Sequence, residues 1–247
     1  MNPTPLPGRL AAATMIGLLA TGALVGCSRT GTQALLPAYD AAKLFGAEQP
    51  AEIVVDRSLT THEEGEHIFA TIEKGTVTSL LTMTLAPSGH DLWRSEIGGE
   101  RASVARVADT EVLLIETTDH PNSAVTTFEP PLPLLSGTLS SGAEVKSSHT
   151  VIVRSLRDPS RLVDRGTAEQ TLTRLDDQEV LLPDGVVYRA ARFRRVLTLD
   201  LGRADVEEVS TAWYVPGVGL AVEESEEKVK ALGFLSWTKR RLLVRVP

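Results

Sequence analysis

The sequence predicts a mainly all-β protein whose strands form one antiparallel meander, and three observations support this fold class. From residue 51 onward, short runs rich in Val, Ile, Thr and Leu alternate with turn signals such as Lys74-Gly75 and Gly98-Gly99. The run from Val187 to Leu201 alternates apolar and polar side chains, as a half-buried strand does. No long segment has the periodicity of an amphipathic helix, which disfavours a βαβ arrangement.

Residues 1–26 are expected to be a signal peptide that is removed from the mature chain. Leu10 to Leu24 is apolar but too short for a permanent membrane helix, and the basic residue Arg9 precedes it. Leu24-Val25-Gly26 then precedes Cys27, an arrangement that resembles the bacterial lipobox. We therefore expect signal-peptidase recognition at Leu24, Val25 and Gly26, and lipidation of Cys27. The alternatives are a secreted protein with an incidental cysteine and an uncleaved anchor helix.

Residues 27–50 are predicted to form a lipidated tether and one short helix. Ser28 to Thr32 is small and polar, and Gln33 to Phe45 has apolar side chains at helical spacing. Acyl chains on Cys27 anchor a protein durably, because each buried methylene contributes about 0.8 kcal/mol. Ser28, rather than Asp, follows the cysteine, which in bacterial lipoproteins favours transfer to the outer membrane. The predicted location is the cell envelope, with a lipid anchor in the outer membrane and the chain facing the periplasm.

Residues 51–247 are predicted to form a single antiparallel β domain. The connection Gly202 to Asp205 returns the chain from the strand that ends at Leu201 into Val206 to Tyr214, which makes a hairpin. Val218 to Val229 and Leu235 to Val246 extend this hairpin into a longer meander. Two charged residues, Arg189 and Arg195, are exceptions on the apolar side of the first strand.

Gly217-Val218-Gly219 could begin a phosphate-binding loop, but the residues that follow exclude it. A dinucleotide fingerprint needs a third glycine, which lets a helix pack closely behind the loop. Val222 occupies that position, and the acidic run that ends at Glu227 would repel phosphate. Pro216 and Gly217 instead fit the centre of a type II turn, in which glycine supplies the positive φ. Pro216, Gly217 and Gly219 are therefore predicted to be structural turn residues.

Three segments, Phe128 to Val145, Val180 to Phe193 and Trp213 to Leu220 (WYVPGVGL), carry a family resemblance. In order and spacing they resemble a group of uncharacterised bacterial envelope proteins with a C-terminal WYxPGVGL signature. That group is similar to the half-barrel lipoprotein-carrier fold, a curved antiparallel sheet around an apolar concavity. The resemblance implies a curved sheet or half-barrel for residues 128–247 of this chain.

Composition argues against nucleic acid and thiol chemistry. The formal net charge is −7, and Lys239-Arg240-Arg241 is the one dense basic run, which we interpret as a solvated strand edge. Cys27 is the only cysteine, so lipidation would leave no thiol for a disulfide, a zinc site or a nucleophile. No nucleic-acid partner is expected.

The remaining polar motifs do not match a catalytic or metal site. His62 and His67 are five residues apart with Gly65 between them, so a polar hairpin tip is favoured over a zinc helix. Adjacent acids such as Glu207-Glu208 and Glu223-Glu224 point to opposite faces of a strand, and we interpret them as the solubilising face of the sheet. No nucleophile elbow occurs. The sequence therefore predicts no catalytic residue, no metal site and no cofactor.

These observations favour a non-enzymatic envelope lipoprotein that is held at the membrane through lipidated Cys27. The function favoured is binding of an apolar ligand, such as a lipid or an acyl chain, in the curved sheet. One alternative is a structural or assembly partner of another envelope protein. The other is a hydrolase whose site carries no motif.

Replacing the lipidated residue tests the predicted anchor. Cys27→Ala should release the protein from the membrane, because the anchor is covalent and the acyl chains supply the attachment. Fractionation after a high-salt wash measures this. A variant that stays in the membrane pellet would contradict the lipoprotein interpretation.

Overall fold

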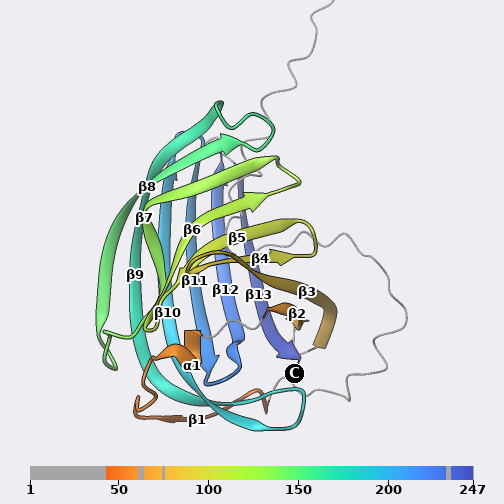
Figure 1. Ribbon diagram of the computed structural model, residues 1–247, viewed down its shortest axis with the longest axis vertical. Helices are drawn as coiled ribbons and strands as arrows, with labels where there is room; N and C mark the ends of the chain where they lie inside the picture. Colours follow the sequence, from red (N-terminus) through yellow and green to blue (C-terminus); the bar gives the residue numbers. More distant parts are fainter. Residues whose placement is uncertain (1–42, 61–63, 74–75, 232–234, 247) are drawn as a thin grey trace, which may run out of the picture.

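The protein is a closed barrel of twelve antiparallel strands, with one further strand paired to β9 at the lower end of the barrel in Figure 1. A computed structural model describes residues 43–60, 64–73, 76–231 and 235–246. From β2 to β13 each strand pairs with the next along the chain, and β13 pairs with β2. The strands are β1 (Phe45–Gln49), β2 (Gly65–Glu73), β3 (Thr76–Gly89), β4 (Leu92–Ile97), β5 (Arg101–Val107), β6 (Glu111–Asp119), β7 (Ala124–Ser136), β8 (Glu144–Ser155), β9 (Leu162–Leu181), β10 (Val187–Leu201), β11 (Ala204–Val215), β12 (Gly219–Ala231) and β13 (Leu235–Val246).

The half-barrel that the sequence predicts is wrong, because the sheet closes on itself. Closure depends on the pairing of Ile68 to Ile72 of β2 with Leu242 to Val246 of β13, which we call the seam. These segments are far apart in the sequence, so a local pattern of alternation gives no sign that they meet. The predicted meander itself is present: β10 has the predicted bounds Val187–Leu201, and β11 to β13 follow it in antiparallel order.

The short N-terminal helix predicted over Gln33 to Phe45 is not confirmed. Residues 33–42 lie outside the described residues, and Phe45, at the end of the predicted range, begins strand β1. This strand joins the sheet through β9, where Phe45 pairs with Val180. The one helix among the described residues is the single turn α1 (Arg57–Thr60), which the sequence did not predict.

Inward-facing apolar side chains form a core along β6 to β12. Period-two alternation on β10 buries the odd-numbered residues from Ala191 to Leu201 and exposes Thr198 and Asp200. The main apolar cluster joins β6–β8 to β10–β12 and includes Phe128, Leu132 and Leu197. Each fully buried side chain of this kind stabilises the fold by about 1.5 to 3 kcal/mol relative to exposure.

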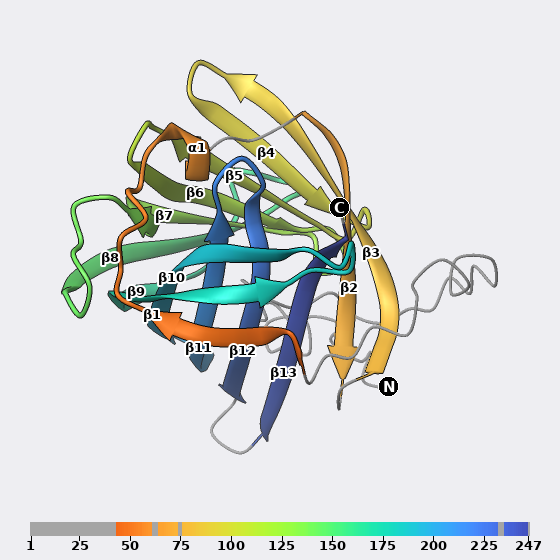
Figure 2. The ribbon, with the colours of Figure 1, turned by 90° about the horizontal axis from the view of Figure 1, so that it is seen from below.

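One end of the barrel is covered by the segment that carries α1 (Figure 2). Leu59 of α1 packs in an apolar cluster with Leu172 and Phe193. The segment is held by the buried carboxylate of Asp177, whose Oδ2 accepts hydrogen bonds from the backbone N–H groups of Glu52 (2.9 Å) and Ile53 (3.0 Å). Because this carboxylate is fully buried, these bonds are needed to offset its desolvation.

Asp177 is held in turn by two arginines. Its Oδ1 accepts a hydrogen bond from the buried Arg174 guanidinium, and its Oδ2 lies 3.2 Å from Arg189 Nη2. The Arg174 guanidinium also lies over the ring of Phe193, 5.1 Å from the centroid. The N-terminal segment is thereby tied to the inner layer of the barrel.

A third apolar cluster braces the seam from the other face of the sheet. Val222, Val244 and Ile72 belong to it, with Trp213 and the fully buried Leu44. The ring of Phe45 stacks on Trp213 with 4.7 Å between centroids. The start of the described chain therefore packs against the strands that close the barrel.

Candidate functional site

The predicted signal and lipidation residues Leu24, Val25, Gly26 and Cys27 lie outside the described residues. Among the residues that the structure describes, no helix has the length and hydropathy needed to span a membrane.

Pro216, Gly217 and Gly219 form the tight connection between β11 and β12. Gly217 has φ +76° and Gly219 has φ +80°, both in the left-handed region that glycine favours. The N–H of Val218 donates to the carbonyl of Val215 (3.0 Å), which places Pro216 and Gly217 at the centre of a β-turn. The N–H of Gly217 donates to the carbonyl of Ser58 (2.9 Å), so the turn holds the segment that carries α1. This N–H is therefore not available to bind a phosphate.

The histidines do not converge on one site within the described part of the chain. His62 lies outside it, and His67 accepts a hydrogen bond at Nδ1 from Arg245 (2.8 Å). His149 is buried and bonded to the carbonyl of Pro130 (2.6 Å) and the hydroxyl of Ser147 (2.7 Å). Across the described residues, no group of three or more His, Cys, Asp and Glu side chains is placed to hold a metal ion.

Charged side chains from six strands instead gather inside the barrel. On β10 to β13 they share a face with core residues such as Leu197, Val206 and Val229, because residues two apart on a strand point the same way. We call this set the interior charge cluster: Arg101, Asp119, Arg195, Glu208, Glu223, Glu227, Lys239 and Arg241.

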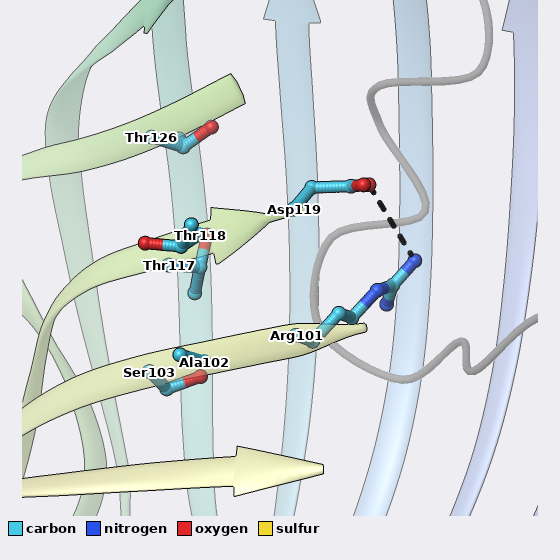
Figure 3. A pocket seen from close by; sticks show the side chains of 7 residues that line it. All are labelled: Arg101, Ala102, Ser103, Thr117, Thr118, Asp119 and Thr126. Atoms are coloured by element: carbon cyan, nitrogen blue, oxygen red, sulfur yellow. Dashed lines mark ion pairs between the residues drawn. The ribbon is translucent and has the colours of Figure 1, made fainter. Parts of the chain in front are cut away.

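Two ion pairs define the geometry of this cluster. Arg195 Nη2 donates to Glu208 Oε1 at 2.5 Å, and both side chains are buried. Arg101 Nη2 lies 4.0 Å from Asp119 Oδ2 across the β5–β6 pair, and the two side chains point toward one another (Figure 3). Arginine suits such sites because its planar fork can satisfy several acceptors.

Glu227 is buried in this cluster with few interactions that offset the desolvation of its carboxylate. It lies opposite Glu208 in the β11–β12 register and is 2% exposed, yet neither of its buried carboxylate oxygens has a hydrogen-bond partner among the described residues. Burial, reinforced by the charge of Glu208, raises the pKa of Glu227 to about 7. Glu227 is therefore partly protonated at neutral pH.

Burial also shifts the pKa values of neighbouring charged groups. Desolvation raises the pKa of Glu223, although Arg195 and Arg241 partly offset the shift. Desolvation and the nearby charge of Arg101 lower the pKa of Lys239. Both directions favour the neutral form, which is the form that a dry interior tolerates.

The hollow beside this cluster is small. It has a volume of about 10 Å³ and lies among Arg101, Asp119 and the hydroxyl-bearing Ser103, Thr117 and Thr126 (Figure 3). One water occupies about that space, whereas ligand sites generally occupy about 300 to 1,000 Å³. A larger groove of about 320 Å³ lies over β3 and β4, beside Thr82, Thr84, Arg94 and Glu96.

Next to the cluster, β13 offers an open strand edge. Residues 235–241 of β13 pair with β12, but no strand among the described residues pairs with their other edge. Residues 235–238 are all exposed, including the large apolar Leu235 (41%) and Trp237 (39%). We call residues 235–241 the open edge.

The prediction that the acidic pairs and the basic run face solvent is wrong in part. Glu207 and Glu224 are exposed as expected, but Glu208 is buried inside the barrel. In the run Lys239-Arg240-Arg241, Arg240 is 78% exposed and pairs with Glu226, whereas Lys239 and Arg241 are more buried. One signal in the sequence could have identified the inner residues: Arg195 is charged although it lies on an apolar face of its strand. The hairpin register places Glu208 on the same face, opposite Leu197.

Comparison with known proteins gives no family for this chain. No family model matches it, and no curated protein matches it. Among solved structures, a predicted exported protein with a YmcC-like fold from Bacteroides fragilis is 10% identical, with a TM-score of 0.43 over 74% of this chain and 95% of that chain. The hypothetical lipoprotein YmcC from Escherichia coli is 10% identical, with a TM-score of 0.40 over 74% of this chain and 86% of that chain.

A predicted lipoprotein from Parabacteroides distasonis is 9% identical, with a TM-score of 0.36 over 78% of this chain and 98% of that chain. At such identities and TM-scores, neither a fold family nor a function is transferred from these proteins to this chain.

Breaking the buried ion pair tests the geometry of the cluster. Arg195→Met should lower the free energy of unfolding by about 3 to 5 kcal/mol, because Glu208 is left buried without its counter-ion. The double variant Arg195→Met/Glu208→Met should recover most of this loss. Chemical denaturation measures both.

Arg194→Met is the matched control, because Arg194 is exposed on the same strand and its loss should have little effect. Equal losses in Arg194→Met and Arg195→Met would show that Arg195 does not face a dry interior.

Proposed function

We propose that this protein is a lipid-anchored envelope component, not an enzyme, that assembles with another envelope protein through the open edge of β13. The observation that carries the proposal is the open edge itself. Its backbone N–H and C=O groups form a template onto which an extended segment of a partner can add as a further strand. The anchor at Cys27 would keep the barrel at the membrane surface where such partners lie.

The side chains of the open edge support the same function. Leu235 and Trp237 remain partly exposed although both are large and apolar. Proteins usually protect exposed strand edges with charges, prolines or covering segments, and exposed apolar side chains at such an edge favour association. Aromatic residues are also enriched among the residues that dominate protein–protein binding.

The apolar cluster inside the barrel argues against a carrier in which an acyl chain lies within the barrel. Phe128, Leu132 and Leu197 are buried in the main apolar cluster, and the hollow beside the charge cluster has a volume of about 10 Å³. Barrels of about eight strands are filled by their side chains, so in this twelve-strand barrel the apolar cluster, and not the strand number, reduces the space for a ligand.

Binding of an apolar ligand remains a second candidate for one reason. In the β12–β13 register Leu235 and Trp237 lie opposite Ala231 and Val229, which belong to the main apolar cluster. An acyl chain could therefore lie along these side chains, at the margin of the barrel.

The hydrolase alternative has less support. Ser210 and Ser225 lie opposite one another among the charged residues, but each is buried. A substrate would need access to a hydroxyl that the barrel wall covers, and catalysis needs the nucleophile within reach of the reacting carbonyl. We therefore propose a non-enzymatic role.

Site-specific photo-crosslinking tests the assembly function. A photoreactive residue at Ser236, in the open edge, should give a discrete crosslinked product in cells that make the full chain. The same residue at Thr198, which is exposed on β10, is the control and should give none. Trp237→Glu should remove the Ser236 product without lowering the melting temperature.

Titration with an acyl-chain fluorophore separates the two candidates. The assembly function predicts no saturable binding to the purified full chain. Saturable binding that is lost in Trp237→Glu, together with no crosslink at Ser236, would contradict the assembly function and support the apolar-ligand binder.

A further inference from the structure

Two carboxylates face each other across the β11–β12 pair inside the barrel. Glu208 and Glu227 are register partners, and each is 2% exposed. Directly opposed residues on antiparallel strands have Cβ atoms about 4.5 to 5.5 Å apart, and like charges at such positions are destabilising. Water cannot screen this pair as it would on the surface.

The two carboxylates differ in the partners that offset the cost of their burial. Glu208 accepts a hydrogen bond from Arg195, whereas the carboxylate oxygens of Glu227 have no hydrogen-bond partner among the described residues. Arg101 of β5 and Lys239 of β13 act on Glu227 by charge alone, against the repulsion of Glu208. The other charged groups that surround these four are Glu100, Asp119, Arg195, Glu223 and Arg241.

This pair lies where the barrel wall is least braced. Within the described part of the chain, residues 235–241 of β13 pair with a strand on one side only, so there this half of the β12–β13 hairpin is attached to the barrel through the β11–β12 pairing. The register pair of Glu208 and Glu227 lies within that attachment, next to the main apolar cluster residue Val229.

We propose that Glu208 and Glu227 form a pH-operated latch on this half of the β12–β13 hairpin. With Glu227 protonated, the two carboxyl groups are compatible and the hairpin is held in the wall. When Glu227 ionises, two buried negative charges face each other in the pairing that attaches the hairpin, and this half of the hairpin opens locally. Opening would hydrate both carboxylates and lengthen the strand edge that is offered to a partner.

The direction of the pH dependence follows from linkage. Burial and Glu208 raise the pKa of Glu227 in the closed barrel to about 7, from an ordinary value of 4.5. The closed state therefore binds the proton more tightly than the open state, so opening becomes easier as pH rises from about 4.5 to about 7 and then levels off. A carboxylate that is simply solvated would give no such dependence in this range.

Hydrogen exchange of the full chain in detergent micelles tests the latch. Protection factors, corrected for the intrinsic pH dependence of exchange, are compared at pH 5 and pH 8. For the amides of residues 225–231 and 235–241 we expect a fall on the order of fifty-fold, with little change in β9 and β10. In Glu227→Gln the fall should disappear.

Glu224→Gln is the matched control, because Glu224 is exposed on the same strand and its replacement should leave the fall intact. Protection that is independent of pH in the wild type, that falls equally in β9 and β10, or that still falls in Glu227→Gln would overturn the latch. The comparison between regions of the wild type requires no variant, so it decides the question even if Glu227→Gln does not fold.

Discussion

The seam between β2 and β13 is the pairing on which the rest of the structure depends. Five register pairs, Ile68 to Ile72 against Val246 to Leu242, join the first and last strands of the meander. Without them the sheet would be an open meander with two free edges, and its concave face would be wet. With them the inward faces of twelve strands surround one interior, in which Glu208 and Glu227 are buried. The apolar cluster around Val222 and Val244, covered by Leu44, braces this short pairing.

Closure of the barrel explains why charged side chains are buried inside it and why we propose recognition at a strand edge. The buried charges of Arg195 and Glu208 are stabilised because the two side chains form an ion pair. The side chain of Glu227 has no hydrogen-bond partner among the described residues, and a raised pKa favours its neutral, protonated form. The apolar clusters occupy part of the interior that closure creates. Because the seam is short, no strand among the described residues pairs with the second edge of residues 235–241 of β13, and this edge is the recognition surface that we propose.

Strands and turns could be predicted from the sequence, whereas closure of the barrel could not. Alternation fixed the bounds of Val187–Leu201, and turn residues such as Pro216 and Gly217 marked the reversals, because both signals depend on neighbouring residues. The seam joins segments that are far apart in the sequence, and β1 is too short to be identified without its partner β9. The sequence predicts that the pair Glu207-Glu208 belongs to the solubilising face of the sheet, because acids usually lie there. Only the strand register, which places Glu208 opposite Leu197 and Glu227 opposite Glu208, shows that both carboxylates lie on the inner face.

The pKa of Glu227 tests the closed, dry barrel most directly, because it reports desolvation at the position where the wall is least braced. Carbon-13 NMR of the Glu227 carboxyl group in the full chain, assigned by comparison with Glu227→Gln, would follow its titration. The closed barrel predicts an apparent pKa of about 7. A pKa near the ordinary glutamate value of 4.5 would show that water reaches the interior and would contradict the account of the fold, the charge cluster and the latch together.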